Sequence, residues 1–421
     1  LMHGRIQKKY EKYNKKNEYT KAEEILRRCF FMRKVAVLFG GKSCENEISV
    51  LTGVFVLNLL DREKYLPIPV FIGKDGVMYS SASMFDLTVF RGGKTGDFPR
   101  VFFEGGCLYS MQEGKKRIKK LHKIDVALNC CHGGLGEGGG VSAIMEWNNI
   151  PLASPKLTAS GVFMDKCMTK TVARALGVPT VDYIRVNEKD YQKRGAFLLK
   201  SVERRLKYPV VVKPAHLGSS IGISVANDEK QLKMAIETAF ALDTRLLIEK
   251  YLKDKQDVNC AAYTLKGDII VSEPESAFGT GIYSFEEKYI KRKTDGGSAH
   301  LTGGNGSYVD GETTVCTAKS GSRYALNGDL RDKIRAYTKT LYKRMNLCGV
   351  VRMDFLVSEG KAYLCEVNTV PGSLAYYLFC ERISDAKHFF SDLIEEAFEN
   401  TDGAKKIVTT GILNNVQWVG K

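Results

Sequence analysis

Three polar side chains with oxygen donors interrupt two strand-like apolar runs near the C-terminus. In VVRMDFLVSEGKAYLCEVNTVPGS, residues 350–373, the donors Asp354, Glu366 and Asn368 stand among Val, Phe, Leu and Tyr. Removing the water of a carboxylate without compensation costs several kcal/mol or more, so the group must be paired, hydrogen-bonded or bound to a metal. Three oxygen donors together favour a hard cation. The fold therefore has to place a cation, or other partners for the carboxylates, beside these strands.

Length and composition predict a globular protein of several domains. The chain has 421 residues, and about 100 to 200 residues per domain predict two to four of them. With 44% hydrophobic and 26% charged residues, the sequence contains no apolar run of about 18 residues that could span a membrane. The eleven Cys are scattered without CxxC or Cys/His ligand spacing, as reduced structural thiols would be.

The N-terminal segment is basic. Residues 1–31 carry nine Lys or Arg against four Glu and lack the apolar stretch of a secretory signal, so we expect a cytoplasmic protein without membrane insertion. Met32 directly precedes the strand-like run RKVAVLFGG. This raises the hypothesis that the native chain starts at Met32, and that residues 1–31 are upstream sequence or an appended basic helix.

The formal net charge of +15 keeps a nucleic-acid partner open as an alternative. The excess is diffuse apart from the basic N-terminal segment and the run KYIKRK at 288–293, and no aromatic-basic recognition motif accompanies it. We therefore expect the charge to lie on solvated surfaces and around phosphate-bearing small ligands, with no nucleic acid bound.

From Met32 onward the pattern is one of strands, glycine turns and helices. The strand KVAVLFG (34–40) turns through glycines into the helical run 43–60, with Ser43 as a candidate N-cap, and further strands follow at 65–73 and within 123–134. Such units predict a parallel sheet whose strand C-terminal ends collect ligands. The glycine turns do not match a dinucleotide fingerprint, so a nicotinamide cofactor is not expected.

A second unit begins near residue 159. The run GVFMDKCMTKTVARALGVPTVDYI predicts a helix that carries Lys166 and Lys170 and ends at Gly177. Lys213 then ends a strand, and HLGSSIG supplies backbone N–H groups and hydroxyls that can cradle phosphate oxygens. The strand RLLIEKYL places Glu249 beside an apolar stretch. Each feature alone is weak, because a strand-end Lys usually lies on the surface and a Gly-Ser loop is usually a turn.

In this order the motifs resemble the D-alanine:D-alanine ligase family of the ATP-grasp superfamily. The resemblance runs from about Val35 to Glu396 and is carried by VAVLFGGKSCENEIS, CHGGLGEGGG, MDKCMTK, VVVKPAHLGSSIG, LLIEKYL, FEEKY, RMDF and EVNTVPGS. It implies an α/β protein of the α+β ATP-grasp type, with a Rossmann-like N-terminal domain followed by two ATP-grasp subdomains. The expected division is a basic extension 1–31, an N-terminal substrate domain 32–158, a central subdomain 159–252, a C-terminal subdomain 253–398 with a mobile lid 279–325, and a tail 399–421.

The resemblance also implies which residues bind ATP and metal. The ATP-binding residues would be Lys166, Lys213, Ser220, Glu249, Lys250, Leu252, Asp257 and Lys288. Asp354, Glu366 and Asn368 would hold two Mg²⁺ ions, with Mn²⁺ as an open alternative. This agrees with the chemistry of Mg²⁺, which takes few carboxylates together with phosphate oxygens and water.

The implied reaction has two steps. The carboxylate of one D-alanine attacks the γ-phosphate of ATP to give an acyl phosphate, and the amine of a second D-alanine then displaces phosphate. Such a transfer needs alignment and charge neutralisation more than a nucleophile on the protein. The residues implied in catalysis are Glu45, Ser219, Tyr289, Arg352 and Gly372, and those at the substrates are His132 and Tyr377.

Structural alternatives stay open for several of these residues. Glu45, placed by the resemblance at the first substrate's ammonium, could instead cap a helix N-terminus. Ser219 and Tyr289, expected to tie the lid to Glu45, could hold a turn and pack in a core. His132 could be a structural histidine. Arg352 and the N–H of Gly372 are expected to stabilise the developing oxyanion.

Three positions depart from the family pattern. Gly138 stands where an Asp is usual, Leu217 where a Glu is usual, and Tyr377 where many members have a Ser for the second substrate's carboxylate. Tyr289 favours an amino acid as second substrate, and D-serine remains an alternative to D-alanine because a pocket rejects an added hydroxyl only weakly. The resemblance also implies a homodimer.

Overall fold

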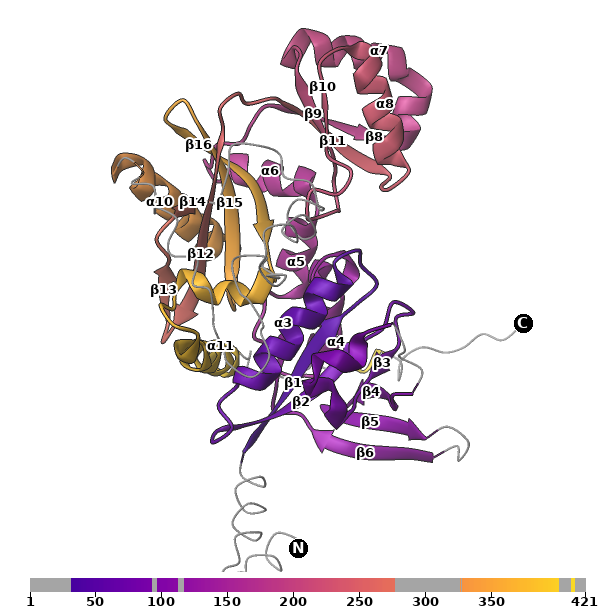
Figure 1. Ribbon diagram of the computed structural model, residues 1–421, viewed down its shortest axis with the longest axis vertical. Helices are drawn as coiled ribbons and strands as arrows, with labels where there is room; N and C mark the ends of the chain where they lie inside the picture. The colour runs from indigo at the N-terminus through magenta and orange to yellow at the C-terminus, as the bar shows by residue number, and fades with distance from the viewer. Residues whose placement is uncertain are drawn as a thin grey trace, which may run out of the picture.

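The computed structural model describes residues 32–92, 97–112, 117–276, 326, 328–400 and 410–412. Within this part, three sheets form three bodies: the N-terminal sheet at the bottom of Figure 1, the C-terminal sheet above it, and a smaller sheet with α7 and α8 at the top. The basic extension 1–31 and the expected lid 279–325, with Lys288 and Tyr289, lie outside the described residues. No helix in the described part is long and apolar enough to cross a membrane.

The N-terminal sheet is mixed rather than parallel throughout. Its seven strands have the order β6-β5-β4-β3-β2-β1-β7, and only the pairs β1 with β2 and β1 with β7 are parallel. The strands are β1 (Arg33–Gly40), β2 (Tyr65–Ile72), β3 (Met78–Tyr79), β4 (Arg100–Glu104), β5 (Cys107–Gln112), β6 (Arg117–Lys123) and β7 (Val126–Asn129). The expected parallel pairing is therefore found at one end of the sheet, in β2, β1 and β7, and an antiparallel meander forms the rest.

Both faces of β1 are buried, which explains its continuous apolar sequence. Val37 and Phe39 pack with helix α3 (Asn46–Leu59), whereas Ala36 and Leu38 pack on the other face with helix α4 (Val141–Trp147). The predicted cap at Ser43 is wrong, because the helix begins after Glu45 and the Ser43 hydroxyl accepts a hydrogen bond from the Glu45 N–H at 3.0 Å.

The predicted helix around Lys166 is two helices. α5 (Leu157–Met164) and α6 (Lys166–Ala175) are separated at Asp165, whose carboxylate accepts hydrogen bonds from the N–H groups of Cys167 and Met168 and so caps α6. The central four-stranded sheet follows, in the order β10-β9-β11-β8. Its strands are β8 (Tyr183–Asn187), β9 (Val210–Pro214), β10 (Ser224–Ala226) and β11 (Arg245–Lys250), and one face is covered by α7 (Glu188–Leu206) and α8 (Glu229–Phe240).

The C-terminal sheet has the order β13-β12-β15-β16, with β14 paired to β12. Its strands are β12 (Gln256–Leu265), β13 (Asp268–Val271), β14 (Glu275–Ser276), β15 (Val351–Ser358) and β16 (Lys361–Asn368). Helix α10 (Gly328–Arg344) packs on it, and the short helix η5 (Gly372–Leu378) and α11 (Ala386–Glu399) follow.

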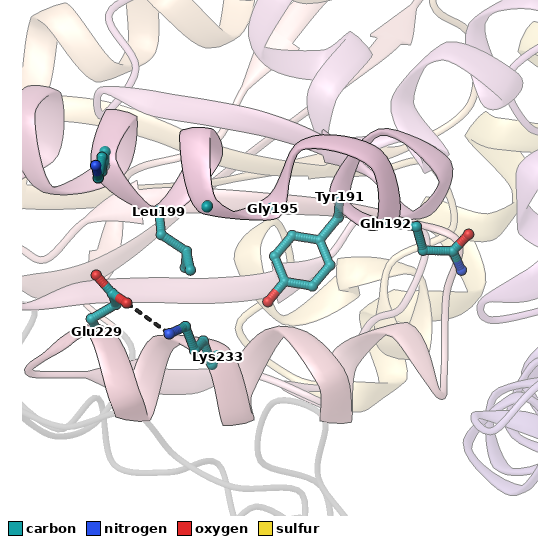
Figure 2. Close-up of a pocket in the computed structure, with 8 residues that line it drawn as sticks. Tyr191, Gln192, Gly195, Leu199, Glu229 and Lys233 are labelled. Atoms are coloured by element: carbon teal, nitrogen blue, oxygen red, sulfur yellow. Dashed lines mark ion pairs between the residues drawn. The ribbon is translucent and has the colours of Figure 1, made fainter.

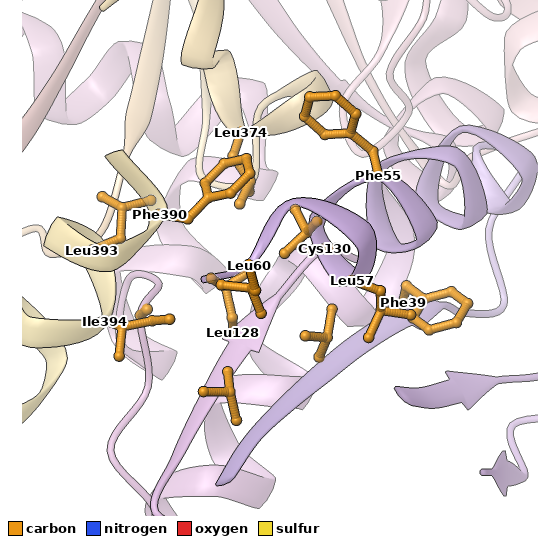
Figure 3. Packing of buried hydrophobic residues seen from close by; sticks show 14 of the residues in the cluster. Phe39, Phe55, Leu57, Leu60, Leu128, Cys130, Leu374, Phe390, Leu393 and Ile394 are labelled. Carbon is orange, nitrogen blue, oxygen red and sulfur yellow. The ribbon is translucent and has the colours of Figure 1, made fainter. Parts of the chain in front are cut away.

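One apolar core joins the N-terminal sheet to the end of the chain. Phe55 of α3 contacts Phe390 of α11, with ring centroids 6.0 Å apart, and Tyr376 of η5 at 5.1 Å. Figure 3 shows Leu393 and Ile394 of α11 turned toward Leu60 and Leu128 of the N-terminal body. This shared core fixes η5 against α3, and thereby positions the residues that follow β16.

Gly53 allows α3 to pack closely on β1. A Cβ at Gly53 would overlap the Phe39 ring, whereas a Cβ at Gly161 in α5 would find only the Gly138 carbonyl oxygen at 3.8 Å. Replacing a helical Gly by Ala gains up to about 1 kcal/mol of helix propensity. Overpacking costs about 1–3 kcal/mol.

We therefore expect Gly53→Ala to lower the thermal unfolding midpoint, and the matched variant Gly161→Ala to leave it unchanged or raise it. Differential scanning calorimetry of the two variants measures the difference. Equal midpoints would contradict the close packing of α3 on β1.

Candidate functional site

Alternation along the central sheet separates its core from its polar face. Val212 and Ile248 point into the core under α7 and α8. The neighbouring residues Lys213 and Glu249 therefore point to the opposite face. Lys213 Nζ lies 3.7 Å from the Sγ of Cys365 on β16, so this face meets the C-terminal sheet.

A buried carboxylate holds two lysines on this face. Glu249 lies 2.6 Å from Lys170 Nζ and 2.5 Å from Lys213 Nζ, and all three side chains are buried. Burial alone would raise the pKa of Glu249, but the two ammonium groups outweigh it and lower the pKa to about 2. Two cations on one anion leave a net positive charge, which suits a phosphate ligand.

Lys166 connects three parts of the site. It is the first residue of α6, its Nζ donates to the carbonyl oxygen of Leu217 at 2.5 Å, and it lies 3.3 Å from Glu366 on β16. The adjoining loop places Ser219 and Ser220 in the left-handed region, at φ 51° and 61°. At position 217, where the family usually has a Glu, the backbone carbonyl oxygen of Leu217 therefore contacts Lys166.

The expected metal ligands are cross-strand neighbours. Asp354 pairs with Glu366, and Arg352 with Asn368, on β15 and β16. The register shifts just after this pair, so that Cys365 is an extra residue on β16. This bulge explains why Cys365 and Glu366, although adjacent, both lie near lysines of one site.

The Asp354 carboxylate accepts hydrogen bonds from two neighbouring side chains. Arg352 donates two parallel hydrogen bonds to it, at 2.7 and 2.8 Å, and Asn368 Nδ2 donates a third at 3.0 Å. Arg352 also donates to the Tyr377 hydroxyl at 3.1 Å. Arg352, which is expected at the oxyanion, thereby connects the candidate metal ligand Asp354 with Tyr377, the candidate contact of the second substrate.

The donor set fits a magnesium ion that is completed by its ligand. Two carboxylates and an amide are hard oxygen donors, but too few to fill an octahedral shell. Among the described residues, no group of three His, Cys, Asp or Glu side chains forms a metal site by itself. The remaining positions would fall to phosphate oxygens and water.

Glu45 and Ser219 meet across two bodies of the protein. The Ser219 hydroxyl donates to a Glu45 carboxylate oxygen, and Glu45 makes no side-chain hydrogen bond to cap α3. The alternatives of a helix cap for Glu45 and a simple turn for Ser219 are therefore less favoured by the geometry. The third member of the expected trio, Tyr289, lies outside the described residues.

His132 is buried with both ring nitrogens bound. Nδ1 lies 2.7 Å from the Val370 carbonyl oxygen and Nε2 lies 2.8 Å from the Thr52 hydroxyl. Because a carbonyl only accepts, Nδ1 carries the proton and Thr52 donates to Nε2. Burial lowers the pKa of His132 to about 4, which keeps the ring neutral. This geometry favours the structural alternative for His132 over direct substrate contact.

Thr52 extends this chain to η5. Its oxygen accepts a hydrogen bond from the Ser373 N–H at 3.2 Å, next to Gly372. Three residues in a row, Ser373, Leu374 and Ala375, have φ near 50° and are rarely stable without such support.

Glu137 links the His turn to the residues after β16. Its carboxylate accepts from the Gly133 N–H at 2.8 Å and the Val370 N–H at 3.2 Å. Burial first, and then the Glu45 charge, raise the pKa of Glu137 to about 7. At the neighbouring Gly138, a Cβ would lie 3.2 Å from Met164, so α5 fills the space where the family usually carries an Asp.

The expected adenine and ribose residues lie at the end of β11 and the start of β12. Lys250 is exposed and Leu252 partly buried, whereas the Glu249 side chain is committed to the two lysines. Asp257 lies 2.6 Å from Lys255.

A surface cavity elsewhere does not meet these residues. It has a volume of about 420 Å³ and lies between α7 and α8, with Tyr191 and the ion pair of Glu229 and Lys233 at its wall (Figure 2). The central sheet separates it from Lys213 and Glu249. The candidate site described above lies on the opposite face of the sheet.

Sequence reasoning assigned no role in the site to three residues. The predicted helix carries Lys170 one turn after Lys166 on the same face, and this spacing is the signal that could have assigned it to the site. Thr52 and His216 carried no local signal, because their partners are distant in sequence.

We expect Thr52→Val to lower the free energy of unfolding by about 1–3 kcal/mol, because it leaves His132 Nε2 and the Ser373 N–H without a partner. Thr52→Ser keeps the hydroxyl and should lose less. Urea unfolding measures both, and equal losses would show that the hydroxyl contributes nothing.

Comparisons with known proteins identify the family. A family model described as D-ala D-ala ligase N-terminus matches residues 34–155, and one described as D-ala D-ala ligase C-terminus matches residues 172–302 and 308–399. The D-alanine–D-alanine ligase of Thermosipho africanus is 32% identical over 87% of this chain and 94% of its own, and that of Caldicellulosiruptor bescii is 30% identical over 86% and 93%.

Solved structures agree. The D-alanine–D-alanine ligase of Helicobacter pylori is similar with a TM-score of 0.65 and 26% identity, over 86% of this chain and 98% of that one. VanG D-Ala:D-Ser ligase from Enterococcus faecalis has a TM-score of 0.64 at 22% identity over 88% and 99%, which shows the shared fold alone. The architecture is thus the ATP-grasp fold, with a Rossmann-like N-terminal domain and two ATP-grasp subdomains, as the sequence predicts. The chain belongs to the D-alanine–D-alanine ligase family.

Proposed function

We propose that this protein joins two D-alanines to D-alanyl-D-alanine at the expense of ATP, as a step of peptidoglycan precursor synthesis. The observation that carries the proposal is the cluster of Lys166, Lys170 and Lys213 around Glu249 and Glu366, facing the carboxylates of β15 and β16. It combines a net positive surface for phosphate with hard oxygen donors for a metal ion. Membership of the D-alanine–D-alanine ligase family indicates that the substrate joined at this site is D-alanine.

ATP is the substrate of the first step. Its phosphates would lie at Lys166, Lys213 and the loop of Ser220, with Lys288 as a further contact from the sequence. Adenine would lie against Glu249, Lys250 and Leu252, and ribose at Asp257. Burial of the lysines strengthens their attraction for phosphate, since the surrounding medium screens charge weakly.

Asp354, Glu366 and Asn368 would hold Mg²⁺, which neutralises phosphate charge during transfer when bound. Two ions, and Mn²⁺ as a substitute, remain part of the proposal. Arg352 already contacts both Asp354 and Tyr377, so its guanidinium is near the proposed metal and the second substrate. There it would stabilise the oxyanion of the tetrahedral intermediate together with the Gly372 N–H.

Glu45 would hold the ammonium of the first D-alanine. Its contact with Ser219 supports this role, because it brings the N-terminal body to the loop proposed to bind phosphate. Tyr289 would complete the lid. His132, bound to Thr52 and Val370, would act on the substrates through the loop of Gly372 rather than by direct contact.

Tyr377 bears on the choice of second substrate. Its hydroxyl accepts from Arg352 and can still donate one hydrogen bond, which suits the carboxylate of a D-amino acid. D-serine is the second candidate acceptor, since a pocket rejects an added hydroxyl only weakly. A homodimer and a cytoplasmic location complete the proposal.

The direct test is phosphate release from ATP and Mg²⁺ with D-alanine alone, with the product identified by mass. We expect D-alanyl-D-alanine, and we expect it to dominate when D-serine or D-lactate competes at equal concentration. If D-alanyl-D-serine were the dominant product, the preferred acceptor would be D-serine and not D-alanine. Bound ATP without phosphate release would contradict ligase activity.

Asp354→Asn tests the metal site. The change keeps the size of the side chain and removes its charge, so we expect the Mg²⁺ concentration for half-maximal activity to rise at least about tenfold. The control is Glu359→Gln, at an exposed residue in the turn between β15 and β16. A Mg²⁺ titration unchanged from the native protein would remove Asp354 from the metal site.

A further inference from the structure

His216 lies directly before the loop proposed to bind phosphate, and its ring lies between two carboxylates. Nδ1 is 3.0 Å from Asp243 Oδ1, and Nε2 is 3.5 Å from Asp165 Oδ2. The His216 N–H also donates to Asp243 at 2.8 Å. Both ring nitrogens thus face acceptors, an arrangement that requires a donor proton on each nitrogen and therefore a charged imidazolium.

The same contacts join the loop to the start of α6. Asp165 caps α6 and precedes Lys166, whose N–H donates to the Ala215 carbonyl oxygen at 3.0 Å and whose Nζ donates to the Leu217 carbonyl oxygen at 2.5 Å. Lys166 therefore binds the residues directly before and after His216 in the sequence. Any loss of the Asp165 contact would loosen the loop relative to Lys166.

The two carboxylates beside His216 are matched by two contacting cations, His216 itself and Arg245, when the ring is protonated. The facing groups are Asp165 and Lys166 at the start of α6, Asp243 in the turn before β11, and Arg245 of β11. Arg245 also contacts Asp165, so two carboxylates meet two cations, and the Lys166 charge is shared with Glu366. A neutral His216 would remove one of these two cations from the carboxylates beside a loop that has to accept phosphate.

We propose that His216, as a charged imidazolium, is a positioning residue that fixes the phosphate loop against α6 and maintains the affinity for ATP. It acts through Asp165 and Asp243 and does not need to touch the nucleotide. The inference rests on the proposed ATP site. It adds a residue that the family motifs did not indicate.

The role depends on pH in a defined direction. Hydrogen bonds with Asp165 and with Asp243 raise the pKa of His216 to about 9. A raised pKa means that the contribution is fully present below the unfolded value of about 6.5 and is lost as the pH rises through about 9. ATP affinity should therefore weaken over this alkaline range.

The test is the dissociation constant of ATP with Mg²⁺, measured by titration calorimetry from about pH 7 to about pH 10. His216→Gln should weaken binding about tenfold at neutral pH and remove the alkaline loss, since it has no proton to lose. His216→Arg keeps a permanent cation, and its 41% exposed position leaves room for the longer side chain. It should retain affinity at neutral pH and lose none of it near pH 9.

Controls separate this inference from the site on which it rests. His388→Gln, at an exposed residue of α11, should behave as the native protein at every pH. Lys213→Met should weaken ATP binding independently of the role of His216. If Lys213→Met has no effect, the proposed ATP site is wrong. If it weakens binding while His216→Gln does not, or if His216→Arg keeps the alkaline loss, the role of His216 is refuted. Circular dichroism at each pH confirms that the variants remain folded.

Discussion

The candidate functional site depends on the pairing of Glu249 with Lys170 and Lys213. Each of these groups is buried, and a buried charge is stable only with a partner. Removing one partner of such a group typically costs about 3–5 kcal/mol, so the three charges have to be kept as a set. The three groups together carry one net positive charge. Lys213 faces β16, close to the two carboxylates and the amide that are the candidate ligands of a cation. Stability and ligand binding thus rest on the same contacts.

The three sheets are arranged so that each contributes part of the site. The central sheet supplies Lys213 and Glu249, the C-terminal hairpin supplies Asp354 and Glu366, and the N-terminal body supplies Glu45 at the start of α3. Their relative positions are held by the apolar core between α3 and α11, by the hydrogen-bond chain from His132 through Thr52 to Ser373, and by Glu137. These polar links are buried or partly buried and are hydrogen-bonded, which makes them specific as well as strong.

The sequence predicted the fold class through the family resemblance, and it predicted the strands that carry the candidate site residues because strands rest on local patterns. The strands of Lys213, Glu249, Asp354 and Glu366 and the Gly-Ser loop lie close to where their motifs indicate. Contacts between distant segments could not be predicted: the break between α5 and α6 depends on Asp165 capping the second helix, and the bulge at Cys365 depends on pairing with β15. The resemblance implies a substrate contact for His132, whereas its two partners, Thr52 and Val370, come from other elements and could not be predicted from the local sequence. The domain boundaries and the roles of Tyr289 and Lys288 stay predictions.

A crystal structure with a non-hydrolysable ATP analogue and Mg²⁺ tests the central claim most directly. The account predicts the nucleotide between the central and C-terminal sheets, with its phosphates at Lys166 and Lys213 and the metal on Asp354 and Glu366. The set of Lys170, Glu249 and Lys213 should remain intact. A nucleotide bound elsewhere, or a metal ion that does not touch Asp354 and Glu366, would contradict it.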